Sequence, residues 1–116
     1  MKDKINILGT EYTISFGTYK EFPALEEMDG YTDTSIHLIV VDDMSMAKDA
    51  IDGKKDLESY KNCVLRHEIT HAFLHESGLA SCSNRPDNWA VNEEMVDWFA
   101  IQSPKIYKVF EELGLL

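Results

Sequence analysis

The segment 66–71, with the sequence Arg-His-Glu-Ile-Thr-His, restricts what this chain can fold into more than any other segment. Residues four apart on a helix lie about 6 Å from each other along one face, so the imidazoles of His67 and His71 can converge on one metal ion. Glu68 lies at the edge of that face, where its carboxylate can reach a water molecule beside the ion as a general base. The motif therefore predicts a helix with two metal ligands and a catalytic carboxylate.

A second motif begins at Asn92, twenty-one residues after His71. A hydrolytic zinc site keeps three protein ligands and leaves a fourth position to water, and Glu93 can be the third ligand. Asp97 falls four residues later on the same helical face. Its carboxylate can accept the second ring N–H of a ligating histidine and fix the tautomer of that ring. We therefore expect a second helix that carries Glu93 as a ligand and Asp97 as its outer partner.

Other zinc layouts fit the residues less well. A metzincin needs glycine and histidine where this chain has Leu74 and Ser77. Three histidines at 67, 71 and 75 would span about 12 Å of helix and cannot surround one ion, so we expect His75 to pack near the helix end or to line a pocket. A closed structural zinc, with Cys63 or Asp97 as fourth ligand, stays an alternative. The simpler expectation for Cys63 is a small side chain that fills space behind the site.

The two motifs together resemble the gluzincin clan of zinc peptidases, whose thermolysin-like members carry H-E-x-T-H and N-E-x-x-x-D. The added His75 and the run Glu93-x-x-Val96-Asp97-x-Phe99-Ala100 are similar to the ImmA/IrrE family of small metallopeptidases found in phages and integrative elements. That family usually has E-x-x-A-[ND]-x-F-A, so Val96 replaces an alanine. The resemblance covers about residues 60–100 and does not include the long extension that some members add.

The resemblance implies a zinc metalloendopeptidase with a zincin-like fold and Zn²⁺ as its cofactor. His67, His71 and Glu93 would hold the ion, and Glu68 would take a proton from the attacking water and pass it to the leaving amine. The substrate would be a protein or peptide, cleaved at a limited site in a specific partner such as a phage-type repressor. The candidates for the oxyanion donor are His75, Tyr107 and Tyr31.

Two features of the implied function stay open. The segment 111–116 is a candidate for a latency device that covers the cleft, as in some minimal gluzincins. The alternative function is a catalytically silent zinc-containing binding or anti-defence regulatory protein of phage or mobile-element origin. The sequence does not identify the substrate, the cleavage site or the oligomeric state.

Composition bounds the class of protein. A chain of 116 residues with 44% hydrophobic and 28% charged residues predicts a single globular domain over 1–116. No apolar run is long enough to span a bilayer and no signal-type segment follows Met1, so we expect a cytoplasmic protein without membrane association. The two cysteines, Cys63 and Cys82, suit a reducing compartment.

The net charge of −10 argues against direct nucleic-acid binding, because the chain has no basic cluster to neutralise phosphates. An acidic surface that serves solubility is the simpler explanation, with a basic partner or DNA mimicry as alternatives.

The residue pattern predicts an α+β fold, with a small antiparallel or mixed sheet packed on the site helix. We expect a hairpin from strands 4–8 and 11–16, a loop or short helix over 19–28, a turn at 29–30 and a strand over 35–41 that contains His37. A zincin strand near this last one forms the edge on which a peptide docks. The helical predictions are 45–51, 57–77, 88–102, and a short C-terminal helix opened by Ser103 and Pro104. The expected contacts between the two site helices come from Val96, Trp98, Phe99, Ile69 and Phe73.

Overall fold

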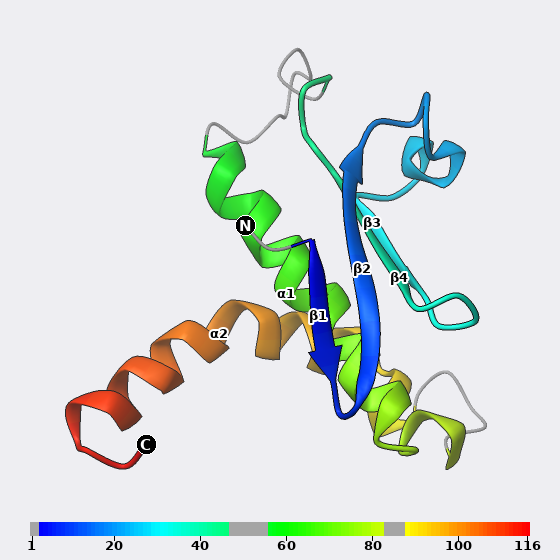
Figure 1. Cartoon of the computed structure of the whole chain (residues 1–116). Coiled ribbons are helices and arrows are strands. Elements are labelled where there is room, and N and C mark those ends of the chain that lie inside the picture. Colours follow the sequence, from blue (N-terminus) through cyan, green and yellow to red (C-terminus); the bar gives the residue numbers. More distant parts are fainter. Residues whose placement is uncertain (1–2, 47–55, 83–87) are drawn as a thin grey trace.

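The computed structural model describes residues 3–46, 56–82 and 88–116, and these form an α+β fold. The strands are β1 (Lys4–Ile7), β2 (Thr10–Gly17), β3 (Gly30–Asp33) and β4 (Leu38–Asp42), in the sheet order β1-β2-β4-β3 (Figure 1). The pair β2–β4 is parallel and the other two pairs are antiparallel. The predicted small sheet is therefore a mixed one.

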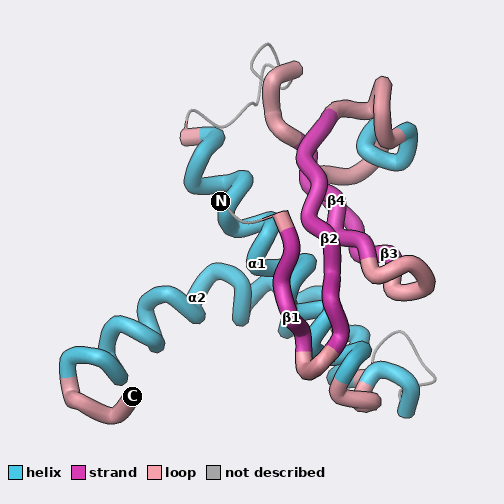
Figure 2. The backbone as a smooth tube through the Cα atoms, viewed as in Figure 1, coloured by secondary structure: helices cyan, strands magenta, loops and turns pink. Residues whose placement is uncertain are grey.

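Two long helices accompany the sheet (Figure 2). Helix α1 (Leu57–Glu76) packs on one face of the sheet, and α2 (Glu93–Glu112) packs on α1. The prediction of a helix over 57–77 is confirmed: Asp56 caps its start by accepting the Ser59 N–H, and Gly78, with φ of 86°, ends it. No helix among the described residues is both long and apolar enough to cross a membrane.

The predicted N-terminal hairpin is confirmed. Ile7 pairs with Thr10, so Leu8 and Gly9 alone form the loop, and both have positive φ, 51° and 94°. Two such residues match the right-handed twist of a hairpin. The Asn6 side chain supports the turn by accepting the Gly9 N–H at 2.8 Å.

The prediction for residues 29–41 is wrong in its first part. The expected turn at 29–30 leads directly into strand β3, and residues 34–37 form a turn where a strand was expected. The reason is local: the Asp33 carboxylate accepts the backbone N–H and the hydroxyl of Ser35, a turn that competes with extended backbone. These bonds also lower the pKa of Asp33. His37, with φ of 54°, therefore lies in the turn and not in strand β4.

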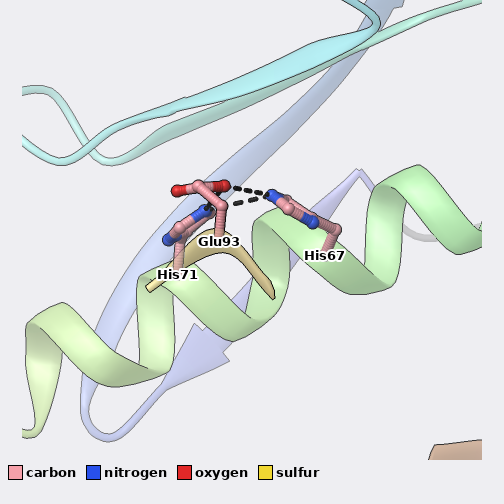
Figure 3. Close-up of side chains that lie close together, drawn as sticks. All are labelled: His67, His71 and Glu93. Carbon is pink, nitrogen blue, oxygen red and sulfur yellow. Dashed lines mark hydrogen bonds and ion pairs between the residues drawn. The ribbon is translucent and has the colours of Figure 1, made fainter. Parts of the chain in front are cut away.

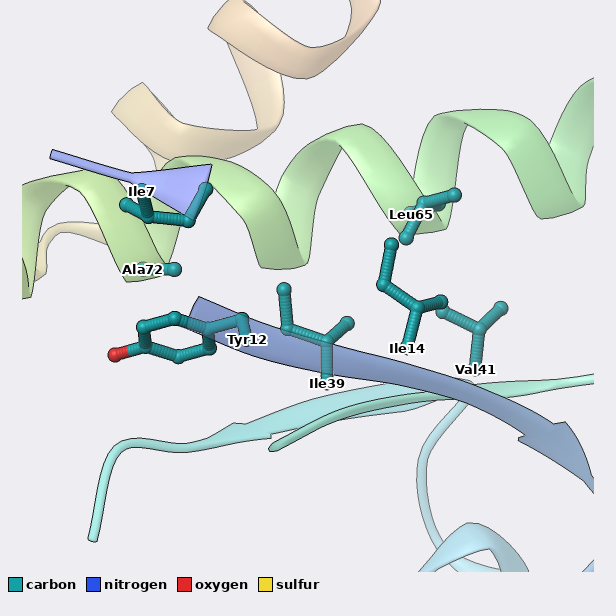
Figure 4. Packing of buried hydrophobic residues seen from close by; sticks show 7 residues of the cluster. All are labelled: Ile7, Tyr12, Ile14, Ile39, Val41, Leu65 and Ala72. Carbon is teal, nitrogen blue, oxygen red and sulfur yellow. The ribbon is translucent and has the colours of Figure 1, made fainter. Parts of the chain in front are cut away.

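The hydrophobic core lies between the sheet and α1 (Figure 4). Ile39 and Val41 project from β4, and Ile14 from β2, toward Leu65 of α1. Tyr12 is buried in the same layer, and its hydroxyl donates to Glu76 at the end of α1 over 2.8 Å. Burial, followed by this bond to Glu76, raises the pKa of Tyr12 well above its usual range. The core thus fixes α1 along the sheet and with it the two histidines.

The predicted break at Ser103 and Pro104 is wrong, because α2 continues through Pro104 to Glu112. Proline has no N–H to donate to the carbonyl four residues earlier, which here belongs to Ala100. Arg66 of α1 supplies the missing donor: its Nε donates to the Ala100 carbonyl over 2.7 Å. A tertiary hydrogen bond therefore replaces the helical one that Pro104 cannot make. Helix α2 stays continuous, and there is no separate C-terminal helix.

Other segments differ in their details. The 19–28 segment contains a short 3₁₀ helix at Pro23–Glu26, and two further 3₁₀ turns lie at Ala80–Cys82 and Trp89–Val91. Helix α2 begins at Glu93, later than predicted, because Asn92 caps it by accepting the Met95 N–H. Most of the predicted helix over 45–51 lies outside the described residues.

Val96, one of the side chains expected between the site helices, is fully buried. A core position is wrong for Trp98, Phe99 and Phe73, whose exposed fractions are 58%, 44% and 42%. Phe99 and Phe73 line a groove between α1 and α2. Ile69 is partly buried against the core.

Candidate metal centre

Two histidines and one glutamate meet between α1 and α2 (Figure 3). His67 and His71 lie one turn apart on α1, and their Nε2 atoms are 3.1 Å from each other. Glu93, the first residue of α2, brings its Oε1 to 3.1 Å from His67 Nε2 and 3.2 Å from His71 Nε2. Three side chains from two helices therefore direct one atom each to a common point.

The spacing of these three atoms fits a zinc ion. Ligand atoms at about 2.0–2.1 Å from a tetrahedral zinc lie about 3.3 Å from one another. The observed separations of 3.1 and 3.2 Å are close to that value. Among the described residues, His67, His71 and Glu93 form the group with ligand atoms near enough to hold a metal ion. Three protein ligands are what a site open to water requires.

Asp97 fixes the tautomer of His67. Its Oδ1 lies 2.7 Å from His67 Nδ1, and a carboxylate only accepts, so the ring proton is on Nδ1. When the ring is neutral, the Nε2 atom of His67 is an acceptor, and it faces the Glu93 oxygen. Acceptors pressed together at hydrogen-bond distance repel one another unless a proton or a cation lies between them. The donor set therefore has the chemistry of a cation site.

Glu68 faces the cavity from the same helix but stands apart from the three candidate ligands. It is 6% exposed, and its Oε2 lies 3.9 Å from His67 Nε2. The hydroxyl of Thr32 on β3 lies 2.9 Å from Glu68 Oε1 and 2.9 Å from the backbone carbonyl of Glu68. Burial raises the pKa of Glu68, and the Thr32 bond opposes part of that rise. Glu68 is therefore a buried carboxylate held beside the three candidate ligands.

Thr32 is the residue that the sequence did not reveal. It lies on β3, a four-residue strand that the pattern did not predict. The available signal was Gly30: a Cβ there would come within 2.8 Å of Val64 Cγ1 and 3.0 Å of the Val40 carbonyl. Only glycine lets this strand lie so close to α1. The close approach brings Thr32 to Glu68.

The centre opens into a cavity of about 820 Å³ between β3, α1 and the start of α2. His75, Tyr31 and Cys63 line it, so two of the three oxyanion candidates lie in the cavity with the cysteine. Tyr107 is not among the lining residues and is 56% exposed. The segment 111–116 does not line the cavity either, so the expected latency contact is not formed.

Asp29 and Tyr60 also line this cavity, and the tyrosine hydroxyl donates to the Asp29 carboxylate. Burial, followed by this bond, raises the pKa of Tyr60 to about 12. The phenol therefore stays neutral near pH 7 and acts as a hydrogen-bond donor in the wall of the cavity.

No protein-family model matches the chain, and no curated protein or solved structure is significantly similar to it.

Proposed function

We propose that this protein is a zinc metalloendopeptidase of the gluzincin type, with a minimal zincin-like fold similar to the ImmA/IrrE family. The observation that carries the proposal is the convergence of three potential ligand atoms, one each from His67, His71 and Glu93, at separations suited to one zinc ion. A buried carboxylate beside them, Glu68, distinguishes the arrangement from a purely structural site, which has no use for such a base.

Zinc bound there would polarise a peptide carbonyl and acidify a water molecule, which supplies the Lewis-acid part of the hydrolysis. Glu68 takes the proton of the attacking water and transfers it to the leaving amine. Thr32 holds Oε1 of that carboxylate, so Oε2 is the oxygen directed toward the histidines. Burial raises the pKa of Glu68, which makes it a stronger base than an exposed glutamate.

The substrate that fits this cavity is an extended segment of a protein partner. β3 is the edge strand next to the cavity, so its free side can add one more strand. The sequence suggested the strand over 35–41 as the edge on which a peptide docks. That strand is β4, which lies inside the sheet, so we assign this role to β3. Tyr31 and His75 are the candidates to stabilise the oxyanion, since both line the cavity. We propose limited cleavage of one such partner in the cytoplasm.

The proposal is tested with a proteome-derived peptide library incubated with the zinc-reconstituted protein. New peptide termini, identified by mass spectrometry, are expected to appear with zinc and to disappear after chelation. Their return on addition of zinc excludes a contaminating protease without a metal. If no new termini form with the zinc-loaded protein, nor with folded candidate partners, the peptidase assignment is wrong.

Replacing Asp97 by asparagine is expected to lower zinc affinity about 10- to 100-fold, the usual cost of losing an outer carboxylate. Asparagine can still contact the ring at His67 Nδ1, but it carries no charge to strengthen the ligand. Competition titration against a chromophoric chelator measures the change. Glu94→Gln is the matched control, because Glu94 is an exposed neighbour of the centre that is absent from the cavity lining. Equal zinc affinities for Asp97→Asn and Glu94→Gln would show that Asp97 does not support metal binding.

A further inference from the structure

The second half of α2 carries a row of apolar side chains that the described residues of the chain do not cover. The buried residues of α2 are Val96 and Ala100, both in its first half. Val109, Phe110 and Leu113 are 51%, 44% and 65% exposed. In Figure 1 this half, coloured orange to red, extends away from the sheet and α1. A helix end of this composition leaves apolar side chains in contact with water, and such exposed apolar surfaces often mark an interaction site.

Two members of the exposed row, Phe110 and Leu113, belong to a stripe that runs along the whole helix. At 3.6 residues per turn, Met95, Phe99, Ser103, Ile106, Phe110 and Leu113 fall on one side of α2 or directly after its end. The charged residues of this half fall off the stripe; they are Lys105, Lys108, Glu111 and Glu112. Glu93 and Asp97 also fall on another face, so the stripe is separate from the metal centre.

The first half of the stripe borders an apolar groove of about 610 Å³ between α1 and α2. Leu8 from the hairpin, Ile69 and Phe73 from α1, and Met95 and Phe99 from α2 line it. The exposed fractions of Leu8, Phe73 and Phe99 are 59%, 42% and 44%. One chain therefore offers both an open apolar groove and an uncovered apolar helix end.

The helix end cannot fill the groove of its own chain. Because α2 is continuous through Pro104, Phe110 lies about 16 Å along the axis from Phe99, which borders the groove. The Arg66 bond to the Ala100 carbonyl supports the helix at the one place where it would otherwise break. Within the described part of the chain no other segment fills the groove, so we look for its occupant in another molecule.

We propose that the occupant is a second copy of this chain, in a symmetric dimer whose two α2 helices pack antiparallel along the stripe. The spacing is self-complementary: with the midpoint next to Pro104, Phe99 of one copy meets Phe110 of the other, Met95 meets Leu113, and Ser103 meets Ile106. A two-fold axis requires this property of a single patch. The small Ser103 lies near the crossing point, where the helices approach most closely.

The area available is sufficient for a stable dimer. Six side chains of the stripe and groove are about half exposed; they are Leu8, Phe73, Trp89, Phe99, Phe110 and Leu113. A large apolar side chain in this state shows on the order of 100 Å² to solvent, so together they present about 600 Å² per chain, or about 1,200 Å² for two chains. Specific, stable interfaces bury about 1,200–2,000 Å² in total, so this area lies at the lower end of their range. The helix end of each copy would enter the groove of the other, and both apolar surfaces would be covered by one contact.

Sedimentation velocity on the whole chain at about 50 µM tests the proposal, because the weaker interfaces of standard size have micromolar Kd values. We expect a dimer for the wild type and a monomer for Phe110→Asp, which places a charge at the helix end without disturbing a residue that its own chain buries. Ile36→Asp is the matched control and should remain a dimer, because Ile36 is 64% exposed in the turn before β4. A monomeric wild type, or a dimeric Phe110→Asp, overturns the proposal.

A second measurement tests the register. With Cys82 replaced by serine, the variant that carries both Phe99→Cys and Phe110→Cys is expected to form a disulfide-linked dimer on mild oxidation. The pair Phe99→Cys with Ile36→Cys is expected to stay uncrosslinked. The opposite pattern on a non-reducing gel would exclude the antiparallel pairing. The dimer does not depend on the metal, so this test and the test of hydrolysis can fail independently.

Discussion

Glu68→Gln is expected to lower hydrolysis by about 100- to 10,000-fold, the usual contribution of a general base. Glutamine keeps the size of the side chain and an oxygen for the Thr32 hydroxyl, which lies 2.9 Å from Oε1 of the native residue. It cannot take a proton from water. Glu68 is not one of the three candidate ligands, so zinc binding should be retained. Cleavage rate and zinc content are measured on the same preparation.

The Glu94→Gln variant controls for the loss of one negative charge near the centre. We expect it to cleave at the wild-type rate, because Glu94 does not line the cavity. Wild-type cleavage by Glu68→Gln would exclude the proposed base. If the protein has a cellular effect that survives Glu68→Gln intact, the alternative of a zinc-containing binding or anti-defence regulatory protein gains the assignment.

Ile39→Ala is expected to destabilise the fold by about 2–5 kcal/mol, the range for removing a large buried aliphatic side chain. Ile39 has an exposed fraction of 0% and lies between the sheet and α1, beside Tyr12 and Ile14. The loss is a large part of the free energy of unfolding of a small domain, which is about 5–15 kcal/mol. Urea unfolding followed by circular dichroism gives the difference.

Ile36→Ala removes the same atoms three residues earlier, from a side chain that is 64% exposed. Its effect should stay within about 0.5 kcal/mol, as is usual for surface substitutions. Comparable losses in the two variants would contradict the observed start of β4 at Leu38 and the turn before it.

The sequence was most informative where the signal is local. The four-residue spacing of His67 and His71 determines their arrangement once the helix forms, and the same spacing links Glu93 to Asp97. Their meeting across two helices was inferred from the motifs together, and the structure brings the four side chains into contact. The hairpin was equally accessible, because alternation and the Gly9 turn are both local features.

What could not be predicted depends on tertiary contacts. Thr32 reaches Glu68 only because Gly30 lets the short strand β3 lie close to α1. A strand of four residues is too short for its sequence pattern to predict this contact. Pro104 would end an isolated helix, because it cannot donate a hydrogen bond to the Ala100 carbonyl. Arg66, 38 residues earlier in the chain than Pro104, donates to that carbonyl instead. The exposure of Phe99 and Phe110 could not be predicted either, because an apolar side chain can be buried by its own chain or by another molecule.

The metal content of the purified protein, measured by mass spectrometry on the wild type and on Glu93→Ala in parallel, tests the central claim most directly. After reconstitution with zinc and removal of excess metal, we expect one zinc per wild-type chain and little in the variant. That result establishes that the three convergent side chains are ligands. A wild type that holds no metal, or a Glu93→Ala variant with undiminished zinc, would contradict the three-ligand centre and with it the proposed peptidase.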